Sequence, residues 1–287
     1  MTSASGIVVV DKPAGLTSHQ VVGRLRRLLG TRRIGHAGTL DPMATGVLIL
    51  GVNRATRLLG HLALHDKRYL ATIRLGESST TDDADGEVQV VADASGLAPQ
   101  EVEQALQPLR GVISQVPSAV SAIKVRGRRA YDLVRQGVEV ELKAREVEVS
   151  RLEVLASRPG DGVLELDVDV ECSSGTYIRA IARDLGASLG VGGHLTSLRR
   201  TRIGAYDLSL AVELGEEPPE LMAMATAARL SFPCLDLDEA TSADVRFGRR
   251  ITRSVPAAVT GLVSPEGELL GLYRPDGEGA RPIAVLV

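Results

Sequence analysis

The stretch RRIGHAGTLDPMATG, from Arg32 to Gly46, brings one carboxylate, one imidazole and two arginines into fifteen positions together with three glycines. Glycine allows the backbone to turn tightly and lets another group approach it closely. The glycines at positions 35, 38 and 46 therefore predict a shaped surface around Asp41, and loops with such a surface often carry function.

Simpler interpretations of this stretch stay open from these residues alone. Asp41 followed by Pro42 also fits a helix that begins with an aspartate N-cap and a proline in its first turn. A single histidine such as His36 is also typical of a hydrogen-bonded structural residue. The choice between a catalytic loop and a helix start therefore depends on the rest of the chain.

Residues 32–57, RRIGHAGTLDPMATGVLILGVNRATR, resemble the signature of the TruB family of tRNA pseudouridine synthases. Four further blocks keep the order found in that family and extend the resemblance over roughly the first 210 residues: GIVVVDKPAGLTS (6–18), KRYLATIRLG (67–76), VPSAVSAIKVRGRRAYDLVRQG (116–137) and SSGTYIRAIARDLG (173–186). Five ordered blocks are very hard to obtain by chance.

The resemblance implies an α+β fold with a mixed, mostly antiparallel β-sheet core and flanking helices, the pseudouridine synthase fold. It places the catalytic domain at residues 1–230. Residues 235–287 combine one short helical pattern with three apolar runs separated by Pro-Glu-Gly and Pro-Asp-Gly turns, which indicates a small β-rich module. By its order and size this module resembles the PUA-like RNA-binding domain appended in the family.

Composition narrows the class of protein. The chain has 287 residues, enough for one large domain and a small one, and only 2% of them are aromatic, so the core must consist of Val, Leu, Ile and Ala. No stretch approaches the roughly 20 apolar residues of a membrane span, and the first five residues resemble no leader, which favours a cytoplasmic protein. Cys172 and Cys234 offer neither a disulfide framework nor metal-ligand spacing.

The net charge of -3 contrasts with the basic surface that RNA binding usually requires. The basic residues are nevertheless clustered, while acidic residues gather at 77–87 and 165–171, which indicates a polarised surface. A solvated charged face remains the alternative for any one cluster. The four basic clusters are Arg24, Arg26, Arg27, Arg32 and Arg33; then Arg126, Arg128 and Arg129; then Arg199, Arg200 and Arg202; then Arg246, Arg249, Arg250 and Arg253.

Local patterns predict the main elements. Thr17 and Gln20 form a capping box at the start of a helix that Gly30 closes. Alternation over 67–75 and 162–172 predicts half-buried strands, and the continuous apolar run 46–52 predicts a strand covered on both faces. We also expect strands at 6–10 and 116–124, and helices within 53–65, over 97–110 and over 131–137.

The acidic segment 77–87, ESSTTDDADGE, is predicted to be a loop. Its aspartates raise the alternatives of metal binding or of a glycosidase carboxylate pair. The spacing fits no EF-hand loop, and no partner stands at a known spacing elsewhere in the chain, so a solvated turn is the preferred interpretation.

Arg179 is predicted in the first turn of a helix that begins near Ile178. A cation gains nothing from the helix dipole at that end, so the position indicates a specific carboxylate or phosphate partner. The family pairs this arginine with the catalytic aspartate. Such a neighbour lowers a carboxylate pKa by about one to three units, which would keep Asp41 ionised.

The resemblance also implies roles for the other site residues. Asp41 is expected to be the nucleophile, and Tyr69, which is otherwise typical of a core tyrosine, stacks on the flipped base. Tyr177 packs beside them and His36 helps to hold the everted loop. Lys12 is expected to support the site, with a solvated turn lysine as the alternative, and Arg199 and Arg200 are expected to contact the tRNA backbone.

These expectations lead to one function. The chain is predicted to isomerise uridine to pseudouridine at position 55, in the T loop of tRNA, by base flipping and attack of Asp41 on C1′ of the sugar or C6 of uracil. It is expected to act as a monomer on the T arm, without a cofactor, a metal or a membrane. The rivals are a non-catalytic tRNA-binding or folding module on the same scaffold and a glycosidase, which would need a second acid facing one bond.

Overall fold

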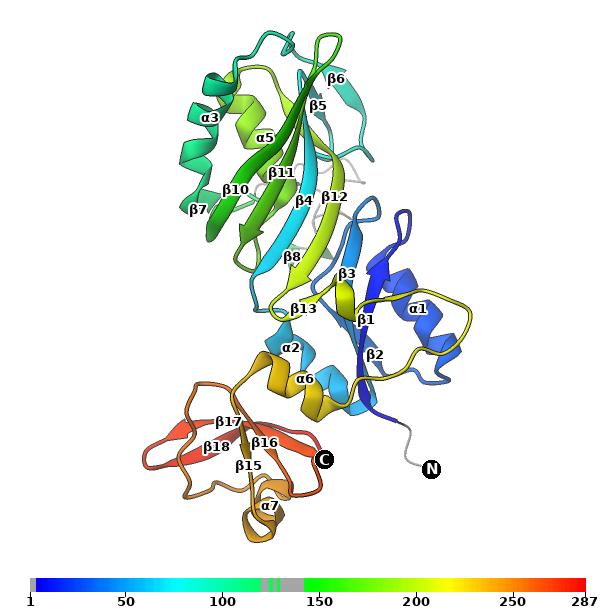
Figure 1. Ribbon diagram of the computed structural model, residues 1–287, viewed down its shortest axis with the longest axis vertical. Helices are drawn as coiled ribbons and strands as arrows, with labels where there is room; N and C mark the ends of the chain where they lie inside the picture. Colours follow the sequence, from blue (N-terminus) through cyan, green and yellow to red (C-terminus); the bar gives the residue numbers. More distant parts are fainter. Residues whose placement is uncertain (1–3, 120–123, 126–127, 130–141) are drawn as a thin grey trace.

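The structure is a computed structural model that describes residues 4–119, 124–125, 128–129 and 142–287 (Figure 1). In this part of the chain, ten strands form one large sheet and four strands form a second sheet near the C-terminus. Among the described residues, no helix has the length and apolar character that crossing a membrane requires. The α+β architecture predicted from the sequence is confirmed.

The first half of the chain runs through β1 (Gly6–Lys12), α1 (Ser18–Leu28), β2 (Ile34–Ala37), β3 (Thr45–Val52), η1 (Asn53–Arg57), α2 (Leu59–Leu62), β4 (Lys67–Leu75), β5 (Glu77–Ser79), β6 (Val88–Val90), α3 (Pro99–Leu106), η2 (Gln107–Leu109), β7 (Gly111–Gln115), β8 (Lys124–Val125) and β9 (Arg128–Arg129). The second half runs through β10 (Arg145–Pro159), β11 (Leu164–Cys172), α5 (Ile178–Leu189), β12 (Gly193–Ile203), β13 (Tyr206–Asp207), η3 (Leu208–Leu210), β14 (Val212–Glu213), α6 (Met224–Ser231), β15 (Cys234–Asp236), α7 (Glu239–Arg246), β16 (Thr260–Val263), β17 (Leu269–Asp276) and β18 (Gly279–Val285).

The large sheet has the order β14-β1-β3-β12-β4-β11-β10-β7, with β2 beside β3 and β13 beside β12. Its described pairs are antiparallel except for β1 with β14 and β3 with β12. The parallel pair aligns Arg199 with Thr45 and Arg200 with Gly46. This junction places the end of the 32–46 stretch beside β12, far from it in the sequence.

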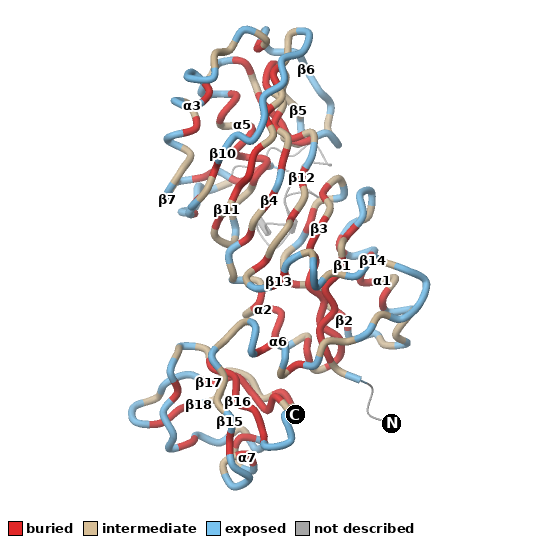
Figure 2. The backbone as a smooth tube through the Cα atoms, viewed as in Figure 1, coloured by how far each residue is buried: buried red, intermediate tan, exposed pale blue. Residues whose placement is uncertain are grey.

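Helices bury both faces of β1 and β3. Residues of α1 pack with Val8, Val10, Leu48 and Leu50 on one side, whereas α2 and α6 pack with Ile7, Val9, Val47 and Ile49 on the other. Burial on both faces explains why these strands read as continuous apolar runs. Figure 2 shows the buried residues gathered on these strands and within the C-terminal sheet.

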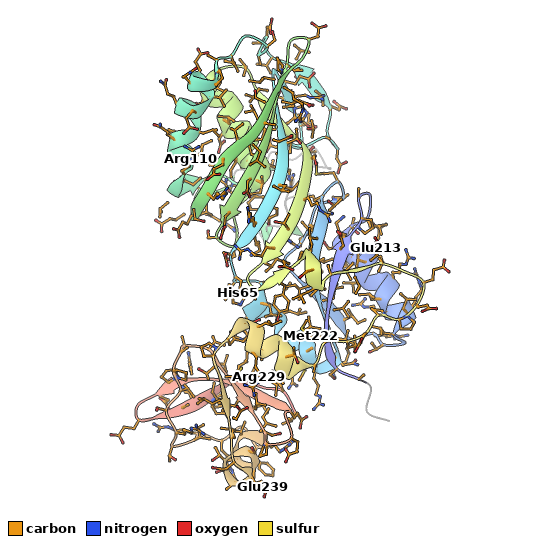
Figure 3. All side chains as sticks on the ribbon, viewed as in Figure 1. His65, Arg110, Glu213, Met222, Arg229 and Glu239 are labelled. Atoms are coloured by element: carbon orange, nitrogen blue, oxygen red, sulfur yellow. The ribbon has the colours of Figure 1, made fainter. Side chains whose placement is uncertain are left out.

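The C-terminal sheet, in the order β15-β16-β17-β18, shares a hydrophobic core with the rest of the molecule. Val263, Leu269 and Leu272 belong to the same buried cluster as Leu58 and Leu62. In Figure 3 the labelled Met222 and Arg229 lie where the two sheets approach each other; Met222 bridges to Ile7 of β1, and Arg229 forms an ion pair with Asp236.

Most predicted elements are confirmed, including the capping box of Thr17 and Gln20 at the start of α1. The strand expected over 116–124 is wrong at its start, because residues 116–119 have no regular structure. Residues 120–123 lie outside the described residues, and Lys124–Val125 pairs with β9. The helix expected over 131–137 lies outside the described residues, as does Arg126. On β11, Asp169 belongs to the alternating acidic positions of a strand predicted to be half-buried, yet it is buried, and Arg68 and Arg151 both ion-pair with it.

Candidate active site

The loop between β2 and β3 carries Asp41, and its conformation is held by distant side chains. No helix begins at Asp41, so the interpretation as an N-cap is wrong. The Ser18 hydroxyl donates to the Leu40 carbonyl (3.1 Å) and accepts from the Leu40 N–H (2.9 Å). The Lys12 Nζ donates to the carbonyl oxygens of Pro13, Leu16 and Pro42.

Lys12 is fully buried, so the alternative of a solvated turn lysine is wrong. Burial lowers the pKa of Lys12 to about 8, with Asp41 opposing and Arg200 adding to the effect. Its three carbonyl partners come from two segments far apart in the sequence. Lys12 therefore joins the turn after β1 to the loop that carries Asp41.

Arg179 ion-pairs with two carboxylates at once. Its Nε lies 3.0 Å from Oδ2 of Asp41, and its Nη1 lies 3.3 Å from Oδ2 of Asp83. Nη1 also donates to the carbonyl oxygen of Thr81 at 2.9 Å. The side chain of Arg179 is 3% exposed, that of Asp83 4% and that of Asp41 33%. The predicted carboxylate partner of Arg179 is therefore Asp41, and Asp83 is a second partner.

Asp83 was missed by the sequence analysis. The segment 77–87 was interpreted as a solvated turn, but Asp83 is buried and bridges to Leu195 of β12, and the N–H of Leu195 donates to the Asp82 carbonyl (3.0 Å). Asp82 has a positive φ of 61°. The prediction of a loop is wrong at the start of the segment, where Glu77–Ser79 forms β5 and pairs with β6. Local composition also cannot indicate that tertiary contacts bury one of the acids of this segment.

Burial raises the pKa of Asp41 above its ordinary value; Asp83 adds to the rise, and Arg179 opposes it. Arg179 lowers the pKa of Asp41, as predicted, but burial outweighs this effect and the net direction is upward. The physical reason is that desolvation disfavours the charged carboxylate, while the guanidinium that opposes this effect is shared with Asp83. Arg179 holds the Asp41 carboxylate in a fixed orientation, while burial disfavours its ionised form.

A pocket of about 260 Å³ opens beside Asp41. Tyr69, Tyr177, Arg179, Lys67 and Arg200 are among its lining residues. Tyr69 is buried, and burial raises the pKa of its hydroxyl while Arg200 opposes the rise. Tyr177 is fixed through its backbone, which donates to Gln115 Oε1 (2.8 Å) and accepts from Gln115 Nε2 (3.1 Å). The structure thus brings together Asp41, Tyr69, Tyr177 and Arg179.

The remaining predicted residues lie outside this group or differ from expectation. His36 does not line the pocket; its ring meets that of His19 edge-on, with centroids 6.0 Å apart. Arg199 ion-pairs with Asp11 at 2.6 Å. Arg200 was expected on the surface but is buried, because its guanidinium donates to the carbonyl oxygens of Val47, Gly38 and Thr39.

The basic clusters differ in how far acids compensate them. Around α7, Arg246, Arg249 and Arg250 ion-pair with Glu268, Asp244 and Asp276, which favours the alternative of a solvated charged face for this cluster. At the end of α1 and the following turn, Arg27, Arg32 and Arg33 form no ion pair within the described ranges. These arginines lie beside the end of β2 that pairs with Val52, whereas the loop that carries Asp41 follows the opposite end of β2.

Comparison with known proteins supplies the family. The family model described as TruB family pseudouridylate synthase, N-terminal domain, matches residues 26–178. Models of the tRNA pseudouridylate synthase B C-terminal domain and of tRNA pseudouridine synthase II, C terminal, match residues 179–217 and 232–287. 

Among curated relatives, tRNA pseudouridine synthase B of Cutibacterium acnes is 58% identical, over 100% of this chain and 99% of the relative. The protein of the same name from Mycobacterium sp. strain KMS is 53% identical, over 98% of this chain and 96% of the relative.

Solved structures agree on the fold. A chain in the structure titled "Crystal Structure of a Cbf5-Nop10-Gar1 Complex" superposes with a TM-score of 0.73 at 23% identity, over 98% of this chain and 85% of that chain. A chain in "Structure of H/ACA RNP bound to a substrate RNA containing 2'-deoxyuridine" gives a TM-score of 0.72 at 22% identity, over the same shares of both chains. The match of the family model and the identity with curated relatives together mean that this chain belongs to the TruB family of pseudouridylate synthases.

Proposed function

We propose that this protein isomerises uridine to pseudouridine in tRNA, at position 55 of the T loop. The observation that carries the proposal is the pocket in which Asp41, held by Arg179 at 3.0 Å, lies beside the buried ring of Tyr69. Relatives that match this chain over nearly its whole length are named tRNA pseudouridine synthase B, which supports the same reaction and substrate class.

The proposed mechanism starts with a uridine swung out of its RNA stack into the pocket, since a stacked base cannot be reached. Tyr69 stacks on the uracil and Tyr177 packs beside it. Asp41 attacks C1′ or C6, while Arg179 orients its carboxylate and Asp83 in turn anchors Arg179. Lys12 keeps the loop in place through its three carbonyl contacts.

We propose that the tRNA T arm lies across the end of α1, where Arg27, Arg32 and Arg33 have no acidic partner among the described residues. His36 helps to hold the everted T loop of the tRNA. Arg199 leaves its ion pair with Asp11 and contacts a phosphate of the tRNA instead. Because tRNA is the proposed substrate, we expect the protein to act in the cytoplasm, as a monomer and without a metal or cofactor.

We also propose two functional units, a catalytic domain at 1–230 and a PUA-like RNA-binding domain at 235–287. The separate four-stranded sheet and the family model that matches 232–287 support this division. The hydrophobic core shared by the two units favours a fixed arrangement between them.

The test is release of tritium from tRNA labelled at C5 of uridine, with wild-type protein and with Asp41→Asn. The wild type should release one tritium per T loop, and the variant should release none while it binds tRNA with near-normal affinity. A non-catalytic binding module would give no release with either protein. Absence of release from unmodified tRNA at saturating wild-type protein would remove the proposal.

A further inference from the structure

Two buried cations line the pocket and have no carboxylate partner among the residues that the structure describes. Lys67 is 7% exposed and Arg200 is 1% exposed, and both line the pocket beside Tyr69. The Nζ of Lys67 donates to the carbonyl oxygens of Ala63 (2.9 Å) and His65 (2.7 Å). Arg200 also donates to backbone carbonyls, and within the described part of the chain neither cation forms an ion pair. The carbonyl dipoles in these hydrogen bonds offset part of the two charges.

The two cations flank the same backbone segment. A Cβ placed on Gly38 would lie 3.6 Å from Nη1 of Arg200 and 3.8 Å from Cε of Lys67. Three residues further along the same loop, Asp41 meets Arg179 and is close to Asp83. One end of the loop therefore carries the acids with their arginine, and the other end carries an excess of buried positive charge.

Burying a cation without a counter-ion is unfavourable, because the charge loses its hydration. Burial, and next Arg200, lowers the pKa of Lys67 to about 8, while Cys172 and Asp66 oppose this. Lys67 is thus still mostly protonated at neutral pH. A positive field fixed in a buried pocket before any substrate arrives is the arrangement that stabilises an anion formed during a reaction.

The proposed isomerisation forms such an anion. Whether Asp41 attacks C1′ or C6, the bond between C1′ and N1 must break, and its electron pair leaves on uracil. The ring then bonds to C1′ through C5, loses the C5 proton and gains a proton at N1. The bond that Asp41 formed breaks, and its electron pair returns to the carboxylate. Between these steps the uracil carries a negative charge shared by N1 and its two carbonyl oxygens.

We propose that Lys67 and Arg200 are catalytic residues that stabilise the uracil anion after it separates from its ribose. The inference rests on the proposed function and adds two roles to it. Arg200 then acts from inside the pocket, on the base, and the tRNA backbone is contacted by other residues. Tyr69, which pairs with Arg200 across β4 and β12, holds the base against this wall.

The test compares uridine with 5-fluorouridine at the target position of the same tRNA. Fluorine withdraws electrons and stabilises the uracil anion. Separation of the 5-fluorouracil anion from C1′ therefore depends less on positive charges of the protein. Single-turnover disappearance of the original nucleoside is followed by digestion and mass spectrometry, with wild type and with Lys67→Met. We expect Lys67→Met to slow uridine by about 10²-fold and 5-fluorouridine by no more than about tenfold.

The ratio of the two losses does not depend on how much of the variant folds, because misfolded protein lowers both rates alike. Arg68→Met is the matched control: it removes a positive charge from the neighbouring position of β4, where the side chain contacts Asp169 instead of the pocket. Both of its rates should stay near wild type. Equal losses for the two nucleosides with Lys67→Met, or no loss, would overturn the inference. Failure of wild-type protein to convert uridine would instead refute the proposed function.

Discussion

Asp83→Asn tests whether a second carboxylate on Arg179 controls the charge of the proposed nucleophile. Nη1 of Arg179 lies 3.3 Å from Asp83 and its Nε lies 3.0 Å from Asp41. Asparagine has nearly the same shape, and its carbonyl oxygen can still accept from Thr81 Oγ1 and from the N–H of Asp85, as the aspartate does at 2.5 and 3.1 Å. The substitution therefore removes charge with little change in packing.

Two effects of this change have opposite consequences. Loss of a hydrogen bond between charged, buried groups costs about 1.5–3 kcal/mol of stability. Each 1.4 kcal/mol by which Arg179 holds Asp41 less firmly in the transition state slows the reaction about tenfold. The pKa of Asp41, however, loses one of the causes that raise it, while burial and Arg179 continue to act.

The direction in which the pH dependence of the rate should move follows from the protonation state that nucleophilic attack requires. Asp41 must be a carboxylate, so activity falls as pH decreases through its pKa, and a raised pKa places that fall at a higher pH than for an ordinary aspartate. In Asp83→Asn the pKa of Asp41 is lower, so the acid limb of the pH–rate profile, where the rate falls with decreasing pH, should move to lower pH. The maximal rate should drop about tenfold or more. Single-turnover tritium release across the acid range, together with urea denaturation, measures both effects.

Asp82→Asn is the control, because Asp82 ion-pairs with Arg183 at 3.4 Å and does not ion-pair with Arg179. Its acid limb should coincide with that of the wild type. If Asp83→Asn leaves the acid limb in place or moves it to higher pH, Asp83 does not govern the charge of Asp41, and the electrostatic argument fails.

Three further changes test the framework around the site. Gly46→Ala should lower the free energy of unfolding, measured by urea denaturation, by about 3 kcal/mol. The reason is that φ of Gly46 is 101° and a Cβ there would lie 2.1 Å from the carbonyl oxygen of Arg200. A decrease under about 1 kcal/mol would contradict the close approach of β3 and β12. Ser18→Ala should lower the free energy of unfolding by about 2 kcal/mol and reduce the single-turnover rate, because it leaves the Leu40 N–H without its partner. An unchanged rate would show that other contacts hold the loop that carries Asp41. Arg32→Gln should weaken tRNA binding and reduce the slope of log affinity against log salt by about 1, with the rate at saturation unchanged; an unchanged slope in a filter-binding titration would exclude a phosphate contact.

Much of the architecture follows from local patterns in the chain. The capping box at Thr17, the alternation over 162–172 and the apolar run 46–52 predict α1, β11 and β3, because each signal lies within or close to one element. The resemblance of ordered motifs also assigns Asp41, Tyr69, Tyr177 and Arg179 to one site, and these residues line one pocket. Here short-range propensity and the final fold agree.

The charges of the site depend on contacts between distant segments, which no local pattern contains. Asp83 stands in a stretch with the composition of a solvated loop, and only its docking on β12 buries it against Arg179. Arg200 belongs to an arginine cluster typical of a nucleic-acid surface, yet the parallel pairing of β12 with β3 turns it inward. The sequence by itself determined the elements and the reacting groups; the tertiary structure decided which charges are buried together, because desolvation and electrostatic neighbours exist only once the chain has folded.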